Sequence, residues 1–251
     1  MPSAWKELDG ERHIRRLALD AWRVVEGQHL ISTRKLVDSD EEQRLLEELL
    51  EGSKPPLPAG TKRLHYLLAT PFRYPPLKYG SRFGTRFERG IWYGAKHLRT
   101  AFAESAYYRL LFLEGTRAEI PRLSLDLTAF KASIRTSRGV DLTRPPFSEQ
   151  AARLASKSSY SATQRLGREL REARVSAFCY PSARDPEGGA AVAVLDPAAF
   201  VQTKPRGLET WHCVATRGGV EVSRRDFFER KSFRFERRVF LVRGRLPRPA
   251  T

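Results

Sequence analysis

The stretch GIWYGAKHLRTAFAESAYYRLLFLEG, residues 90–115, joins a short apolar segment to a long helical pattern. Residues 90–95 predict a strand, because the run is short, partly aromatic and bounded by glycine. Residues 96–115 predict a helix, since most of their apolar side chains recur on one face at the helical period. A strand followed directly by a long helix favours a fold that mixes both types of element.

The segments before this stretch predict an N-terminal helical layer. ERHIRRLALDAWRVVEG, residues 11–27, has apolar residues at helical spacing. DSDEEQRLLEELLEG follows, with Ser39 as the expected N-cap and Gly52 as the stop. Proline and glycine are dense in GSKPPLPAG, which ends at Gly60 and therefore marks a boundary. We expect residues 1–60 to form a helical extension and residues 61–251 to form the main domain.

Strand patterns dominate the rest of the chain. The expected strands are RLHYLLAT (63–70), EIPRLSLDLTAF (119–130), VSAFCYP (175–181), AAVAVL (190–195), a pair around the Gly218-Gly219 turn and SFRFERRVFLVRG (232–244), with helices in SEQAARLAS (148–156) and SATQRLGRELREAR (161–174). Helices cluster early and strands recur late. This order predicts an α+β fold rather than repeated βαβ units.

Composition narrows the classes of function. The net charge of +16 at pH 7 suggests an anionic partner, which could be nucleic acid, a phosphorylated small molecule or an acidic protein. No apolar run reaches the roughly 20 residues that cross a bilayer, and the N-terminus has no apolar core of a secretory signal. We therefore expect a cytoplasmic protein without a membrane partner. Cys179 and Cys213 lie in apolar runs, and the five histidines are scattered, so we expect buried thiols and no metal site.

The segment FRYPPLKYGSRFG, residues 72–84, places two arginines around a loop rich in proline and glycine. The guanidinium groups of Arg73 and Arg82 could hold a pyrophosphate through paired N–H donors. The alternative is that Gly80 and Gly84 serve tight turns while both arginines are solvated. The loop matches neither GxGxxG nor the Walker pattern.

Tyr93 and Glu104 follow Arg82 at successive intervals of eleven residues. An aromatic ring next to a carboxylate suits a sugar whose anomeric carbon develops positive charge, because the carboxylate stabilises that charge. Each residue also has an ordinary structural explanation, as a strand aromatic and as a solvated helix acid. Downstream, Ser182 and Arg184 lie in a loop between two expected buried strands, with a plain turn as the alternative.

Taken together, FRYPP, GSRFG, GIWYGA, AFAE and YPSARDPEGG resemble the RES domain, named for its arginine, glutamate and serine, in the order found in that family. The resemblance covers about residues 63–205. RES domains occur in the toxins of RES-Xre toxin-antitoxin modules. The resemblance implies an ADP-ribosyltransferase-like core of mixed and antiparallel sheets with flanking helices. It also implies cleavage of the nicotinamide-ribose bond of NAD, with water, phosphate or a protein side chain as acceptor.

The resemblance also implies residue roles. Arg82 would bind the NAD phosphates, Tyr93 would contact the nicotinamide ribose, and Glu104 would stabilise the ribosyl cation. Arg73 matches the first family arginine, and Ser182 matches the family serine, with Arg184 beside it as a second phosphate contact. The other residues assigned to NAD binding are Tyr74, Ser81 and Phe83.

The leading hypothesis is a cytoplasmic toxin that depletes NAD by phosphorolysis or hydrolysis and is inhibited by an Xre-like antitoxin protein. In this hypothesis NAD is a substrate, no metal takes part, and nucleic acid is contacted only through the antitoxin. The toxin would form a homodimer or a hetero-oligomer with the antitoxin. One alternative is a protein ADP-ribosyltransferase. Another is a non-catalytic nucleic-acid-binding or regulatory protein that uses the basic surface.

Overall fold

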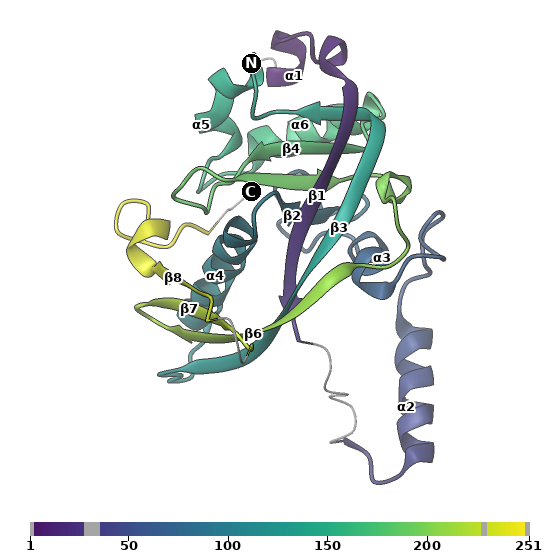
Figure 1. The fold of residues 1–251 in the computed structure, drawn as a ribbon, viewed down its shortest axis with the longest axis vertical. Helices are drawn as coiled ribbons and strands as arrows, with labels where there is room; N and C mark the ends of the chain where they lie inside the picture. Colours follow the sequence, from purple (N-terminus) through teal and green to yellow (C-terminus); the bar gives the residue numbers. More distant parts are fainter. Residues whose placement is uncertain (1–2, 28–35, 227–229, 249–251) are drawn as a thin grey trace.

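The computed structural model describes residues 3–27, 36–226 and 230–248 of the chain, and it combines helices with a large sheet (Figure 1). The elements in chain order are α1 (Ala4–Glu7), η1 (Gly10–His13), β1 (Arg15–Glu26), α2 (Asp40–Ser53), α3 (Tyr66–Arg73), β2 (Trp92–Ala95), α4 (Leu98–Gly115), β3 (Leu123–Asp141), η3 (Phe147–Gln150), α5 (Ala151–Leu154), α6 (Ser161–Glu172), β4 (Ala177–Pro181), β5 (Ala190–Val194), η4 (Pro197–Ala199), β6 (Arg206–Thr216), β7 (Gly219–Arg224), β8 (Ser232–Glu236) and η5 (Arg237–Phe240).

The strands of the described residues form one sheet in the order β1-β2-β5-β4-β3-β6-β7-β8. β1 pairs with β3 as well as with β2, so the strands from β1 to β3 in this order close into a ring. Paired strands are antiparallel, except that β3 and β4 are parallel. The predicted α+β class is confirmed.

The helix predicted over residues 11–27 is wrong, because this segment forms β1. The strand pairs with β3 from Arg15 opposite Gly139 to Glu26 opposite Leu127. Its apolar residues alternate as well as recurring at helical spacing, and the long neighbouring strand satisfies its backbone hydrogen bonds. Only α1 and α2 are regular α-helices within the described part of the predicted N-terminal layer. The domain boundary near residue 60 stays a prediction.

Helix α2 begins as predicted, since the Ser39 hydroxyl accepts a hydrogen bond from the backbone N–H of Glu42. The helix stands away from the rest of the molecule in Figure 1. Arg73 links it to the body through an ion pair with Glu51 at 2.7 Å and a hydrogen bond to the carbonyl of Pro55.

The strand predicted over residues 63–70 is also wrong, because residues Tyr66–Arg73 form α3. The imidazole of His65 accepts a hydrogen bond from the N–H of Leu67 and so caps the helix. Leu68 and Phe72 are buried on one face. This capping and one-sided burial stabilise a short helix that lies beside β2 and leads into the loop that follows.

Helix α4 is confirmed, and it packs against β1, β6, β7 and β8. Its Phe102 lies against Trp211 of β6, with the ring centroids 4.7 Å apart, in the largest apolar cluster of the described residues. The strands predicted at β2, β4 and β5 and the β6–β7 hairpin are also confirmed. The last predicted strand is shorter than expected, since β8 gives way to η5 at Arg237.

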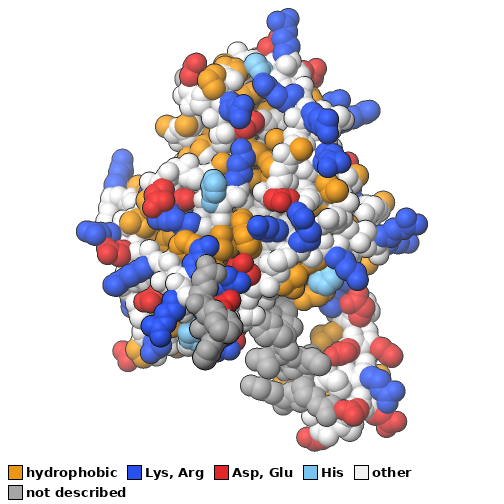
Figure 2. Space-filling model, in the orientation of Figure 1, with side chains coloured by type: hydrophobic (Ala, Val, Ile, Leu, Met, Phe, Trp, Pro, Cys, Tyr) orange, Lys and Arg blue, Asp and Glu red, His pale blue; other side chains and the backbone are white. Residues whose placement is uncertain are grey.

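The charged side chains are unevenly distributed over the surface. In Figure 2, Lys and Arg side chains spread over the visible face of the body, while acidic side chains gather over α2.

Cys179 and Cys213 are buried free thiols, as predicted. Among the described residues, no helix is both long and apolar enough to cross a membrane.

Candidate active site

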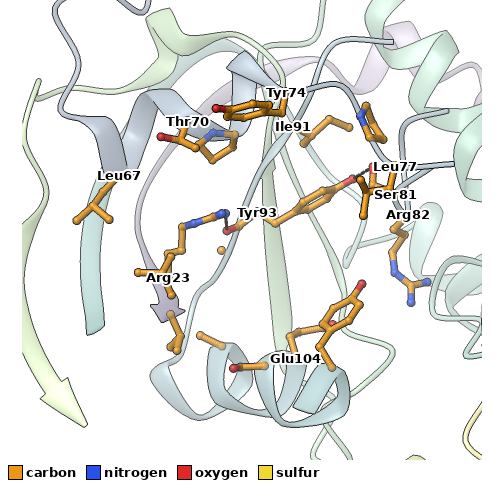
Figure 3. Close-up of a pocket in the computed structure, with 18 of the residues that line it drawn as sticks. Arg23, Leu67, Thr70, Tyr74, Leu77, Ser81, Arg82, Ile91, Tyr93 and Glu104 are labelled. Carbon is orange, nitrogen blue, oxygen red and sulfur yellow. Dashed lines mark hydrogen bonds between the residues drawn. The ribbon is translucent and has the colours of Figure 1, made fainter. Parts of the chain in front are cut away.

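A cavity of about 740 Å³ lies between α3, the loop after it, β2, α4 and the end of β1. Tyr74, Ser81, Arg82, Tyr93 and Glu104, which come from four separate sequence motifs, all line it. Figure 3 shows Tyr93 near the centre, Arg82 to one side and Glu104 on the helix below. The volume is typical of pockets that bind small molecules or cofactors, about 300–1,000 Å³.

The loop that carries Arg82 is a tight turn, and hydrogen bonds from another helix hold it in place. Gly80 has a φ of +74°, a left-handed conformation that favours glycine. The N–H of Ser81 donates to the carbonyl of Gly84 at 2.7 Å and closes the turn. The side-chain amide of Gln164, on α6, donates to the carbonyls of Tyr79 and Ser81. Helix α6 therefore fixes the position of the loop.

The Arg82 guanidinium is buried and only partly satisfied. Its Nη1 donates to the carbonyls of Leu154 and Ser156, at 3.3 and 3.0 Å. Its carbon Cζ lies 4.8 Å from the ring centroid of Tyr160. The other amino group, Nη2, is buried and has no hydrogen-bond partner among the residues that the structure describes. A buried cation with a free donor is suited to an anionic ligand.

Tyr93 connects the strand β2 to the same loop. Its hydroxyl accepts a hydrogen bond from the N–H of Phe83 at 3.1 Å and shares a second one, at 2.9 Å, with the Ser81 hydroxyl. Burial raises the pKa of Tyr93 to about 12, so the phenol stays neutral at neutral pH. The residue therefore supplies a fixed aromatic wall and a neutral hydroxyl rather than a phenolate.

Glu104 is oriented by the loop between β4 and β5. The Ser182 hydroxyl donates to Oε1 of Glu104 at 2.6 Å, and it accepts hydrogen bonds from the N–H groups of Arg184 and Asp185, each at 3.1 Å. The serine proton is thus directed at the carboxylate. Asp185 is in turn bound by Arg99 and Thr100, both on α4. The first turn of α4 therefore holds the loop against Glu104, which lies one turn further along the same helix.

The sequence model of the RES domain matches residues 57–215, which is more than half of the chain. The chain belongs to the RES domain family. A comparison with curated proteins returned no match. Among solved structures, the chain is similar to the crystal structure of the M. tuberculosis MbcT-MbcA toxin-antitoxin complex, at 12% identity and a TM-score of 0.47 over 84% of this chain and 91% of that chain.

Within this RES domain, four of the residues predicted to be in the site do not line the cavity. Arg73 is one of them, because it ends α3 and turns toward α2, where it pairs with Glu51. Phe83 is fully buried, with its ring centroid 4.8 Å from that of Phe178 and 4.7 Å from that of Tyr180. Direct contact of Arg73 or Phe83 with a ligand, as expected from the sequence, is not supported by these positions.

The other two of the four come from the loop after β4. Ser182 is buried and reaches the cavity only through its hydrogen bond to Glu104. Arg184 is 1% exposed, and its Cζ lies 3.5 Å from the ring centroid of Tyr107. Within the described part of the chain, both of its terminal amino groups lack a hydrogen-bond partner. Arg184 does not line the cavity, so its predicted direct contact with a phosphate is likewise not supported.

Sequence reasoning missed several residues of the cavity wall. Arg23 comes from β1, and Tyr108, Arg109 and Tyr160 come from α4 and from the residue before α6. Tyr108 lies four residues after Glu104, and Arg109 lies four residues after Ser105, so each is one turn further along the helix on the same face as its counterpart. No local pattern places Arg23 in the cavity, because its strand is decided by pairing with the distant strand β3.

The arrangement can bind an anion, position an aromatic or sugar ring and stabilise a nearby positive charge. Among the described residues, no group of three or more His, Cys, Asp or Glu side chains could hold a metal ion. The functional groups that line the cavity include guanidiniums, phenols, hydroxyls and the carboxylate of Glu104, which the Ser182 hydroxyl orients.

Proposed function

We propose that the chain is the toxin of a toxin-antitoxin module and cleaves the nicotinamide-ribose bond of NAD. The observation that carries this proposal is that Arg82, Tyr93 and Glu104 line one cavity although they belong to different elements. Membership of the RES domain family supports the same reaction class, as the sequence motifs imply.

In the proposed reaction the bond between the anomeric carbon and the nicotinamide nitrogen breaks, and its electron pair leaves with nicotinamide. The nicotinamide ring of NAD is already cationic, so its departure as a neutral molecule needs no general acid. Positive charge then develops on the ribose. The carboxylate of Glu104 stabilises that charge, and the Ser182 hydroxyl holds the carboxylate in place.

The other cavity residues would orient the substrate. The free Nη2 of Arg82 is the donor we assign to the pyrophosphate. Tyr93 would hold the ribose and exclude water from one side of the anomeric carbon. With water as acceptor, the products are nicotinamide, ADP-ribose and a proton. With phosphate as acceptor, the new bond joins the anomeric carbon to a phosphate oxygen.

The test is nicotinamide release from NAD by the purified chain and by Glu104→Gln, an almost isosteric change that removes the charge. We expect release to fall by about a hundredfold or more, the size typical for loss of one electrostatic stabiliser. Glu114→Gln is the matched control, because Glu114 lies on the same helix and outside this cavity. Equal rates for both variants would remove Glu104 from the mechanism. Dependence of the rate on phosphate separates phosphorolysis from hydrolysis.

We also propose a protein antitoxin of the Xre-like type as the physiological partner. Inhibition of toxicity and of nicotinamide release by co-expression of the protein encoded next to this chain would support the pairing. Labelled NAD that marks a discrete host protein band would instead support protein ADP-ribosylation.

A further inference from the structure

A pair of cationic side chains, separate from Arg82, lines the cavity on the side of β1. Arg23 projects from β1 and Arg109 from α4, one turn beyond Glu104 and Ser105. Arg23 donates through Nη1 to the backbone carbonyl of Tyr93 at 2.6 Å, and its Cζ lies 5.5 Å from the ring centroid of Trp92. The Nε atoms of Arg23 and Arg109 are both buried, and neither has a hydrogen-bond partner in residues 3–27, 36–226 and 230–248.

The charge of this pair is poorly compensated within the chain. Among the described residues, no carboxylate forms an ion pair with Arg23. Burial lowers the pKa of Arg23 to about 10, which leaves the side chain protonated at neutral pH. Arg109 pairs with Glu26, whose side chain is 61% exposed and therefore well solvated. Arg23 is thus a desolvated cation without a carboxylate counter-ion among the described residues, which is costly, so a bound anion would stabilise this wall.

The pair is separate from the group that holds Arg82. Figure 3 shows Arg23 and Arg82 on opposite sides of Tyr93, with Glu104 on the helix below. β1 lies before residue 57, where the match to the RES domain begins, so the matched motifs do not supply Arg23. Its place in the cavity follows instead from the pairing of β1 with β3 and from Trp22, which lies opposite Ala95 of β2.

We propose that Arg23 and Arg109 form a second anion subsite, which takes a phosphate group in addition to the pyrophosphate assigned to Arg82. The part played by Arg82 rests on the proposed function. Two sources share this chemistry. One is a phosphate monoester carried by the substrate, as on the 2′ position of a phosphorylated nicotinamide dinucleotide. The other is free inorganic phosphate bound beside the ribose.

The test is calorimetric binding to the full chain, which needs no turnover. The probes are ADP-ribose, ADP-ribose with a 2′-phosphate, and inorganic phosphate added to the chain saturated with ADP-ribose. If the monoester is the source, the 2′-phosphate compound binds more tightly than ADP-ribose. Arg23→Met and Arg109→Met should then each lower the ratio of these two affinities by a factor of about ten or more. If free phosphate is the source, the same variants weaken phosphate binding by a similar factor.

The control is Arg16→Met, an exposed arginine on the same strand, which should leave all three affinities unchanged. Arg23→Lys keeps the charge and should retain part of the binding that Arg23→Met loses. Circular dichroism shows whether each variant is folded. The subsite would be overturned if Arg109→Met and Arg16→Met had the same affinity for the 2′-phosphate compound and also the same affinity for inorganic phosphate. Failure of the proposed function is distinct, since it appears as absence of nicotinamide release in the unaltered chain.

Discussion

Gly167 is the position at which α6 touches the loop that carries Arg82, and its replacement by alanine tests that contact. A Cβ atom there would lie 2.0 Å from the carbonyl oxygen and 2.8 Å from the carbonyl carbon of Phe83, where ordinary contact begins at 3.4 Å. The Phe83 atoms are backbone and the helix backbone fixes the position of the added Cβ, so no side-chain rotation relieves the clash. The Phe83 ring is packed against Phe178 and Tyr180, which limits movement of the loop.

Overpacking of this kind costs about 1–3 kcal/mol. Alanine is intrinsically better than glycine in a helix by about 1 kcal/mol, which offsets part of the cost. Because the colliding groups are rigid, we expect Gly167→Ala to lower the free energy of unfolding by about 2 kcal/mol. Urea denaturation followed by tryptophan fluorescence measures the change. We also expect reduced nicotinamide release, since the Arg82 loop must shift.

Gly52→Ala is the matched control, because no atom of the described residues lies within 4 Å of the added Cβ in α2. It should leave stability unchanged or raise it by up to about 1 kcal/mol. Equal stability of Gly167→Ala and the unaltered chain would refute the close approach of α6 to the loop.

Three further experiments test individual contacts of the site. Tyr93→Phe removes the acceptor of the Phe83 N–H and should cost about 1–3 kcal/mol in urea denaturation, whereas Tyr79→Phe, at an exposed ring, should cost nothing measurable. The pKa of Tyr93 is raised from 10 to about 12, so its stabilising effect is complete below pH 10 and is lost as pH rises toward 12. The unaltered chain should therefore lose more stability over that interval than Tyr93→Phe does; parallel curves would contradict this. Arg73→Met should leave nicotinamide release nearly unchanged while Arg82→Met reduces it strongly, and the reverse order would show that Arg73 reaches the substrate.

The sequence predicts those elements whose local pattern and tertiary contacts agree. Helix α4 has a long apolar face, and α2 has an N-cap serine followed by acidic residues, so both helices were predictable. β1 was not, because its residues satisfy a helical as well as an alternating pattern, and only the partner strand β3 decides between them. α3 was mistaken for a strand because a short apolar run has no distinctive period.

The candidate site was predictable where the motifs themselves carry the ligand-facing groups. Arg82, Tyr93 and Glu104 line one cavity because a turn, a strand and a helix converge there. Arg73 could not be placed correctly, since its direction depends on the ion pair with Glu51 of α2. Arg23 could not be found at all, because it reaches the cavity through a strand paired to residues more than a hundred positions away in sequence.

The account depends most directly on where the nicotinamide ribose binds. The decisive measurement is a crystal structure of Glu104→Gln soaked with NAD, in which the slowed reaction preserves the substrate. We predict the anomeric carbon beside the side chain of residue 104, the ribose against Tyr93 and the pyrophosphate within hydrogen-bond distance of Arg82. NAD bound outside this cavity, or bound within it with the nicotinamide ribose remote from residue 104, would contradict the proposed mechanism.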